Sequence, residues 1–275
     1  MTNLTFGQFY PAKSFVHNMN ASVKILLTIA YIVAVFMVTA YHFLGFLACF
    51  LFVIIASIFA KIPFLRVLKS IKGILFIVVF SAILQLFFIT SGNVLCSWWI
   101  FTITDGGLLS AGYITARISL MVLGASLLTL TTTPVDLADG IETLLYPLKF
   151  IKFPVHEFAL IMSIALRFIP SLMEETDRII KAQKARGADF ESGNIFKRIR
   201  ALVPVFIPLL ISSLRRAEEL SNAMDARCYA SSKNRTKYKK LKLTYRDLLG
   251  AILVAGLIVG VVYLNGFYAF LTVAL

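Results

Sequence analysis

Long uncharged runs of apolar residues dominate the first half of the chain and its end. No charged residue falls within 25–60, 73–104 or 248–275. A helix needs about 20 apolar residues to cross the hydrocarbon core of a bilayer. The first run is too long for one crossing and too short for three, so it predicts two helices that meet near residues 41–45. The pattern predicts an integral membrane protein.

Together the apolar runs predict five membrane-spanning helices. They cover about residues 25–41, 44–60, 73–91, 108–131 and 248–272. Arg117 is the charged residue inside the fourth of these spans, where an ionised group usually faces the interior of the bundle. This position favours a structural partner for Arg117, or snorkelling of its side chain to the membrane surface, over a place on a transport path.

The distribution of charge gives the orientation of the spans. The net charge is +13, and most of the 27 Lys and Arg residues lie between 132 and 246 or flank the first three predicted spans. The loop 91–107 has no Lys or Arg and carries Trp98 and Trp99, as an outer interfacial loop would. The positive-inside rule therefore predicts a cytoplasmic amino terminus and a cytoplasmic block 132–246. It also argues against nucleic acid as the reason for the basic balance.

The fold class that follows is an all-α membrane protein with a cytoplasmic helical domain. We divide the chain into 1–131 with the first four spans, 132–246 with a helical domain and a basic connector, and 247–275 with the last span. The connector, residues 231–246, is suited to contact anionic membrane lipid.

Three helices are predicted in the block 132–246, one from its capping residues and two from their long helical patterns. Thr133 as N-cap, Pro134 at the first helical position and Asp136 three residues after the cap form a helix-start signature. Two helical patterns of about 32 residues follow at 155–186 and 196–227. We expect them to bring their charged ends together beneath the membrane.

The two long patterns end in nearly the same way. Each places an arginine between two small residues: Ala185, Arg186 and Gly187 in the first, Ala226, Arg227 and Cys228 in the second. Arginine keeps its charge in any environment and offers a planar fork of donors for carboxylates. Small neighbours would let the groove of a partner close over the helix end. Gly187 can also end its helix by adopting a left-handed conformation.

The second long pattern carries an apolar stripe at the helical period. Its members are Leu202, Phe206, Leu209, Ser213, Ala217, Leu220 and Met224. A contiguous apolar face of this size predicts a partner, because such a patch is unusual on a lone protein.

Catalytic signatures are absent from the sequence. There is no G-x-x-x-x-G-K-[ST] phosphate loop, H-E-x-x-H or G-x-S-x-G motif. We therefore expect no catalytic residue, no metal site and no cofactor held by this chain. Two rival functions remain open: a membrane-embedded, metal-dependent transferase with Asp136 and Asp139 as ligands, and a self-sufficient permease. A nucleic-acid binder using 231–246 is disfavoured, because that run has no companion fold.

Four blocks resemble those of the CbiQ/EcfT family, the transmembrane T components of energy-coupling factor transporters. They are "GQFYPAKSFVH" (7–17), "TPVDLADGIETLLYPL" (133–148), "ALRFIPSLMEETDRIIKAQKARG" (165–187) and "AMDARCY" (223–229). The resemblance covers nearly the whole chain. It departs from the family at residues 19–22, where Met-Asn-Ala-Ser replaces the usual Leu-Asp-Pro-Arg.

The resemblance implies a non-catalytic coupling subunit in a prokaryotic cell membrane. Arg186 and Arg227 would be the arginines of two coupling motifs, each docked on one of two ATP-binding-cassette ATPases (EcfA and EcfA′) that hold ATP and Mg²⁺. The apolar face would contact a substrate-binding S component, with Leu202, Phe206, Leu209 and Leu220 as the expected contacts. In the family, this assembly imports vitamins or other micronutrients, and the S component selects the compound.

Overall fold

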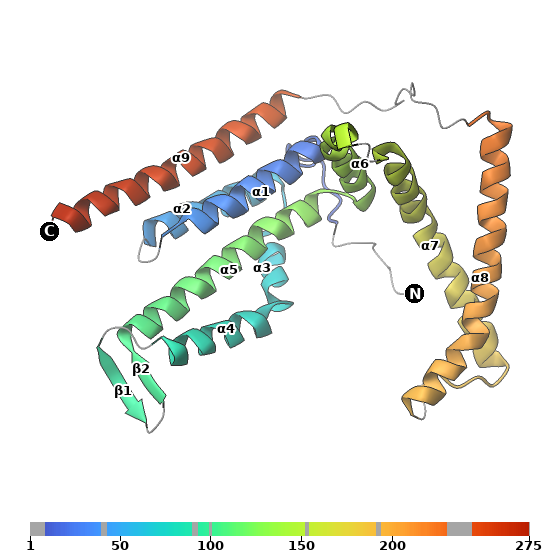
Figure 1. Cartoon of the computed structure of the whole chain (residues 1–275), viewed down its shortest axis with the longest axis horizontal. Helices are drawn as coiled ribbons and strands as arrows, with labels where there is room; N and C mark the ends of the chain where they lie inside the picture. Colours follow the sequence, from blue (N-terminus) through green and yellow to red (C-terminus); the bar gives the residue numbers. More distant parts are fainter. Residues whose placement is uncertain are drawn as a thin grey trace. The chain divides into compact units, whose positions relative to one another are not determined.

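The computed structural model describes residues 9–39, 43–89, 93–98, 101–151, 154–190, 194–229 and 244–274. These residues are helical almost throughout, and they include one small β-hairpin (Figure 1). In chain order the elements are α1 (Ala21–Met37), α2 (Phe43–Phe59), α3 (Phe64–Lys72), α4 (Leu75–Phe88), β1 (Val94–Trp98), β2 (Phe101–Thr104), α5 (Asp105–Thr131), α6 (Pro134–Leu145), the 3₁₀ helix η1 (Tyr146–Ile151), α7 (Val155–Ala185), α8 (Ile195–Ala226) and α9 (Tyr245–Ala274).

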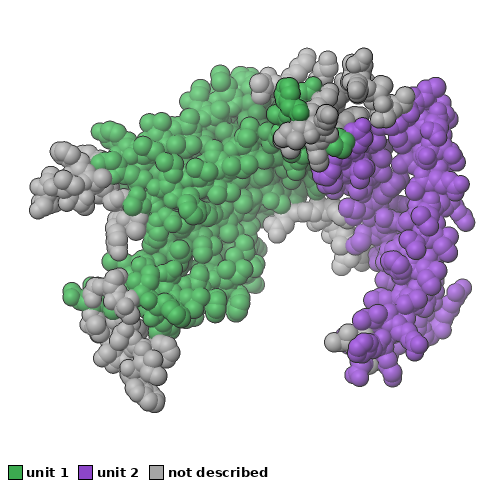
Figure 2. All heavy atoms as spheres, viewed as in Figure 1, with its two compact units in different colours: residues 1–155, 241–275 green, residues 156–240 purple. Residues whose placement is uncertain are grey.

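Two compact units divide these elements (Figure 2). The first combines residues 1–155 with 241–275 and holds α1 to α6 together with α9. The second, residues 156–240, holds almost all of α7 and all of α8. Helix α6 packs against α1 in the first unit, although the sequence analysis grouped residues 132–155 with the cytoplasmic domain.

The apolar helices of the first unit follow the predicted spans. Among the described residues, α5 and α9 are long and apolar enough to cross a bilayer. The pair α3 and α4 forms a third candidate that is bent by 63°, while α1 and α2 are shorter apolar helices of 17 residues each. The prediction of an all-α membrane protein is confirmed.

Helices α1, α2, α5 and α9 pack around a core in which Tyr31 is central. Its ring is 3% exposed and stacks on that of Phe52 with centroids 5.5 Å apart. A Cβ atom added at Gly124 would lie 2.3 Å from the Tyr31 ring, so only glycine allows α5 to approach α1 this closely. Small residues allow such contacts between helices in lipid, where the hydrophobic effect does not drive association.

The hairpin β1–β2 occupies the loop that the sequence placed outside the membrane. Its strands pair antiparallel, with a register shift between Val94 and Cys96. At its end the Thr104 hydroxyl accepts a hydrogen bond from Gly107 N (3.2 Å) and donates one to Ile89 O (2.9 Å). Thr104 thereby caps α5 and attaches it to the end of α4. These strands were not predicted from the sequence.

Candidate functional site

Helices α7 and α8 of the second unit form a crossed, antiparallel pair (Figure 1). Gln183, near the end of α7, donates to Pro204 O near the start of α8 (3.5 Å). Further along, the Arg216 guanidinium contacts the Ser171 hydroxyl and the Glu175 carboxylate, the latter at 2.5 Å. Both helices continue through their internal prolines.

The end of α7 has the hydrogen bonds of a Schellman motif. Gly187 N donates to Lys184 O (3.0 Å), and Ala188 N donates to Gln183 O (3.0 Å). Gly187 has a φ of +87°, the left-handed conformation expected from the sequence. Arg186 is therefore the C-cap residue, placed where the helix stops.

The end of α8 repeats this arrangement. Cys228 N donates to Asp225 O (2.9 Å), and Tyr229 N donates to Met224 O (3.0 Å). Cys228 has a φ of +55°, a conformation that is uncommon for a residue with a side chain. Arg227 is the C-cap residue. The two helices thus present an arginine at the same position of the same motif.

We call these two helix ends the arginine tips, residues 185–187 and 226–228. All six residues are exposed. A cation is electrostatically favourable at a helix C-terminus, where carbonyl groups lack helical partners. Because α7 and α8 are antiparallel, the tips lie at opposite ends of the pair. The expectation that the charged ends would come together is therefore wrong.

The apolar stripe expected on α8 divides into two parts. Leu202 and Phe206 are 50% and 61% exposed. Leu209 and Leu220 are half-buried, and Leu220 lines a cavity of about 440 Å³ between the helices together with Ile164 of α7. From Ser213 onward the predicted stripe therefore faces α7 across this cavity and is less available to another protein.

A second apolar stripe, which the sequence analysis missed, lies one position further along α8. We call it the outer stripe. Its members are Phe196, Ile199, Val203, Ile207, Leu210 and Leu214, and each is between 47% and 86% exposed. Their spacing of three and four residues is the same helical signal that identified the first stripe. Periodicity alone could not decide which of two adjacent apolar faces would meet α7.

Arg117 binds the carboxyl end of α1. Its guanidinium donates to Val38 O (2.7 Å) and lies 4.3 Å from the centre of the Tyr113 ring. Tyr113 donates to the same carbonyl (2.6 Å), and Asn265 of α9 donates to Met37 O (2.7 Å). These donors satisfy carbonyl groups that would otherwise be unpaired in an apolar setting. The structure thus gives Arg117 the structural partner that its position favoured.

Lys24 has a comparable role at the other end of α1. It is only 6% exposed, and its ammonium donates to His17 O (3.1 Å), Thr131 O (3.1 Å) and Thr132 Oγ1 (3.4 Å). From the sequence, lysines in this region were expected to mark the topology. The structure shows that this one joins α1 to the end of α5.

Asp247 connects the starts of α1 and α9. Its carboxylate is 3% exposed and accepts from Asn20 N (2.9 Å) and from Thr244 N (2.8 Å). The side chain of Asn20 accepts from Ser22 N (3.0 Å) and caps α1. Asparagine is as good an N-cap as aspartate, so Asn20 caps α1 although residues 19–22 depart from the family pattern.

The helix start predicted at residue 133 is confirmed. Asp136 N donates to Thr133 Oγ1 (3.1 Å), and the Thr133 hydroxyl donates to the Asp136 carboxylate (2.7 Å). Pro134 occupies the first turn of α6. Within the described ranges, no three His, Cys, Asp or Glu side chains are grouped as a metal site. The rival assignment of Asp136 and Asp139 as a metal pair gains nothing from this geometry.

Comparisons with known proteins agree with this architecture. The model of the CbiQ family, described as cobalt transport protein, matches residues 12–238. The energy-coupling factor transporter transmembrane protein EcfT of Ruminiclostridium cellulolyticum is 49% identical over 90% of this chain and 91% of its own length. The proteins of the same name from Clostridium kluyveri and Bacillus subtilis are 44% and 41% identical, over 91% and 94% of this chain and 92% and 98% of their own lengths.

The fold and these similarities define the class of protein: a helical membrane component of a transport system. The match to the family model, residues 12–238, includes residues of both units and both arginine tips. The chain belongs to the CbiQ/EcfT family, and it is the transmembrane component of an energy-coupling factor transporter.

Proposed function

We propose that this chain transmits ATP-driven motion from two ATPase subunits to a substrate-binding S component, which imports a vitamin or another micronutrient. The observation that carries the proposal is the pair of matched arginine tips. Two helices of different sequence end in the same motif, and each places an exposed arginine at its C-cap. A single exposed arginine at a helix end is common and does not indicate a binding site. Two helix ends with the same motif and the same exposed arginine favour a common role in binding partners.

The chemistry of the arginine tips suits docking on acidic grooves. A guanidinium can bind a carboxylate through two parallel hydrogen bonds, and the small residues beside it allow the wall of a groove to approach. The chain itself needs no catalytic residue for this role. ATP and Mg²⁺ would be held by the ATPases, and the chain would contribute no cofactor.

The antiparallel arrangement of α7 and α8 supports one ATPase at each tip. Tips at opposite ends of a crossed pair can bind two different subunits at once. When ATP draws those subunits together, the tips would move with them and change the crossing of α7 and α8. The exposed apolar residues of α8, the outer stripe with Leu202 and Phe206, would transmit that change to the S component.

The proposed orientation in the cell membrane places the amino terminus and the second unit in the cytoplasm. The basic residues near the start of α1, along α3 and through α7 and α8 support it under the positive-inside rule. The hairpin β1–β2, in a loop without Lys or Arg, would lie outside.

Charge reversal at each arginine tests the proposal. Arg186→Glu and Arg227→Glu should each weaken ATPase binding and abolish uptake, because truncating one partner of a buried ion pair already costs about 2–5 kcal/mol. The measurement is co-purification of the tagged chain with its ATPases, together with uptake by cells. Arg178→Glu, an exposed charge reversal on α7 away from the tip, should leave both unchanged. Wild-type ATPase yield and uptake in both tip variants would exclude coupling through the tips.

A further inference from the structure

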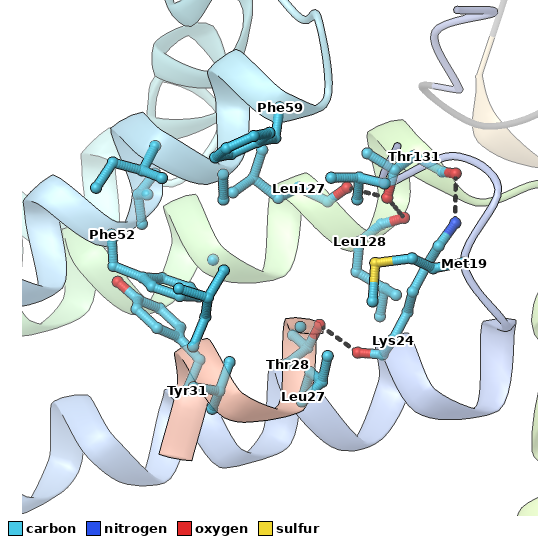
Figure 3. A pocket seen from close by; sticks show the side chains of 18 of the residues that line it. Met19, Lys24, Leu27, Thr28, Tyr31, Phe52, Phe59, Leu127, Leu128 and Thr131 are labelled. Carbon is cyan, nitrogen blue, oxygen red and sulfur yellow. Dashed lines mark hydrogen bonds between the residues drawn. The ribbon is translucent and has the colours of Figure 1, made fainter. Parts of the chain in front are cut away.

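An apolar pocket lies among the helices of the first unit (Figure 3). Its volume is about 410 Å³, within the range of about 300–1,000 Å³ that is typical of ligand pockets. Helices α1, α2, α5 and α9 and the segment before α1 all contribute to its wall. Lys24 and Thr131 lie at one end, and the rings of Tyr31 and Phe52 lie at the other.

The polar groups in the wall of this pocket already have partners within the protein. Thr28 donates to Lys24 O (2.8 Å), and Thr131 donates to Leu127 O (2.7 Å). Tyr31 donates to Leu120 O (3.3 Å), and the Lys24 ammonium has the three acceptors described above. A polar ligand would therefore find few unpaired groups to bind. The pocket suits hydrocarbon.

Two aromatic rings in the wall of the pocket have cations nearby, one in space and one in the chain. The rings of Phe15 and Phe59 line it with centroids 6.3 Å apart, and Phe15 also contacts Tyr245. The Arg246 guanidinium lies 5.9 Å from the centre of the Phe15 ring. Lys61, which is exposed, follows Phe59 by two residues. We call these residues the cationic rim: Phe15 and Phe59 line the pocket, Tyr245 and Arg246 contact Phe15, and Lys61 follows Phe59 in the chain.

We propose that the pocket binds one acyl chain of an anionic glycerophospholipid, whose phosphate is held at the cationic rim by Lys61 and Arg246. The bilayer supplies hydrocarbon chains at high concentration beside these helices. A chain that enters from the bilayer gains contacts with walls that would otherwise line a void. The headgroup gains attraction to the two cations, and this attraction selects anionic over zwitterionic lipid.

The lipid site is independent of the proposed coupling function. It lies wholly in the first unit, whereas the arginine tips belong to the second. A chain that lost ATPase binding could still bind lipid, and a chain that lost lipid binding could still bind the ATPases. The two proposals can therefore fail separately.

Filling the pocket tests the site directly. The full-length chain, purified in mild detergent, is mixed with equal amounts of phosphatidylglycerol and phosphatidylcholine that carry the same acyl chains, and bound lipid is counted by native mass spectrometry. The wild type should retain one phosphatidylglycerol. Ala56→Trp should lower that retention at least about tenfold, a difference of about 1.4 kcal/mol in binding. Ile58→Trp, on the exposed face of the same helix, should bind as the wild type does.

Removing the cations tests the preference for an anionic headgroup. Lys61→Gln and Arg246→Gln should each weaken phosphatidylglycerol binding about fivefold and leave phosphatidylcholine unchanged. Lys72→Gln, an exposed cation on α3, is the matched control.

If Ala56→Trp does not fold, as judged by circular dichroism, Leu128→Trp fills the same pocket from α5. Equal retention of both lipids by the wild type, or undiminished retention by a folded pocket-filling variant, would overturn the proposal.

Discussion

At the scale of single residues, the two arginine tips share one unusual backbone conformation. Gly187 and Cys228 both have positive φ, at +87° and +55°. Glycine adopts this region freely, whereas a residue with a Cβ does so at a cost of about 1 kcal/mol. The geometry of each tip therefore depends on the residue that follows its arginine.

Gly187→Ala should loosen the end of α7. We expect a local destabilisation of about 1 kcal/mol, because alanine disfavours a φ of +87°. Hydrogen exchange of the Ala188 amide, which donates to Gln183 O, measures this loss as about a fivefold decrease in protection. Gly112→Ala, in a helix where an added Cβ meets nothing within 4 Å, should not weaken the protein. Unchanged protection at Ala188 would contradict the motif.

His17 predicts a pH dependence of stability. Its Nε2–H donates to Tyr10 O (2.9 Å), so in the neutral ring Nδ1 accepts from the Ser14 hydroxyl (2.7 Å). Burial lowers the pKa of His17 below its ordinary value of 6.5, and the charge of Lys24 lowers it further, against the opposing effect of the Tyr10 carbonyl. The folded chain therefore takes up this proton less readily than the unfolded chain.

The stability that His17 contributes is accordingly present above pH 6.5 and is lost as the pH falls through that value toward the lower pKa of the folded state. We expect the unfolding midpoint of the detergent-solubilised protein to decrease between pH 7.5 and pH 5.5. In His17→Gln the decrease should be smaller. Parallel pH profiles for the two proteins would show that this ring is not responsible.

At the scale of elements, the sequence predicted best where one local signal decides the outcome. The capping residues at 133–136 identified the start of α6, and Gly187 identified the end of α7, because each depends on a few adjacent residues. The apolar helices α1, α2, α4, α5 and α9 were predictable for the same reason. The hairpin β1–β2 was not predicted, because its residues were interpreted only through their lack of basic charge.

Packing between elements was harder to predict. Lys24 is a cation near a membrane surface, and nothing local shows that it is buried against two acceptors at the distant end of α5 as well as His17 O. Helix α8 has two adjacent apolar stripes, and only the packing against α7 reveals which one remains exposed. Both outcomes depend on contacts between residues that are far apart in the sequence.

The outer stripe should therefore be more important for the S component than Leu209 or Leu220. Val203→Asp and Ile207→Asp place a charge at positions that are 47% and 50% exposed. We expect the S component to dissociate while both ATPases remain bound, because a charged residue at an apolar contact costs more than 1 kcal/mol. Pull-down of the assembled complex measures both effects.

A matched control adds the same charge elsewhere on α8. Asn222→Asp lies at an exposed polar position and should release neither partner. Leu220→Asp should instead disturb the packing of α7 on α8, which circular dichroism would report as lower thermal stability. Loss of the ATPases from the outer-stripe variants, with the S component retained, would reverse our assignment of faces.

At the scale of the whole molecule, the arrangement of α7 and α8 determines how the chain could transmit force. Antiparallel helices with tips at opposite ends respond to the relative position of two bound subunits. Parallel helices with adjacent tips would report the position of one subunit only. Both tips could be predicted from their residues, but their separation could not, because the pairing of α7 with α8 depends on contacts such as those of Arg216.

This arrangement predicts that the distance between the arginine tips changes with the nucleotide state. Spin labels at Ala185→Cys and at the native Cys228, both exposed, report that distance by pulsed electron resonance. The background carries Cys96→Ser, and the buried Cys49 should remain unlabelled. In the assembled transporter, the distance distribution should shift when ATP replaces the nucleotide-free state.

A second pair of labels separates motion between the helices from motion within one. Met173→Cys and Ala185→Cys, with Cys228→Ser, lie on α7 about 18 Å apart at 1.5 Å per residue, and their distance should stay constant. A shift between the tips with a constant distance along α7 requires α7 and α8 to move as rigid rods about their crossing. If ATP leaves the distance between the tips unchanged in a complex that hydrolyses it and imports substrate, force must reach the S component by a route other than this crossing.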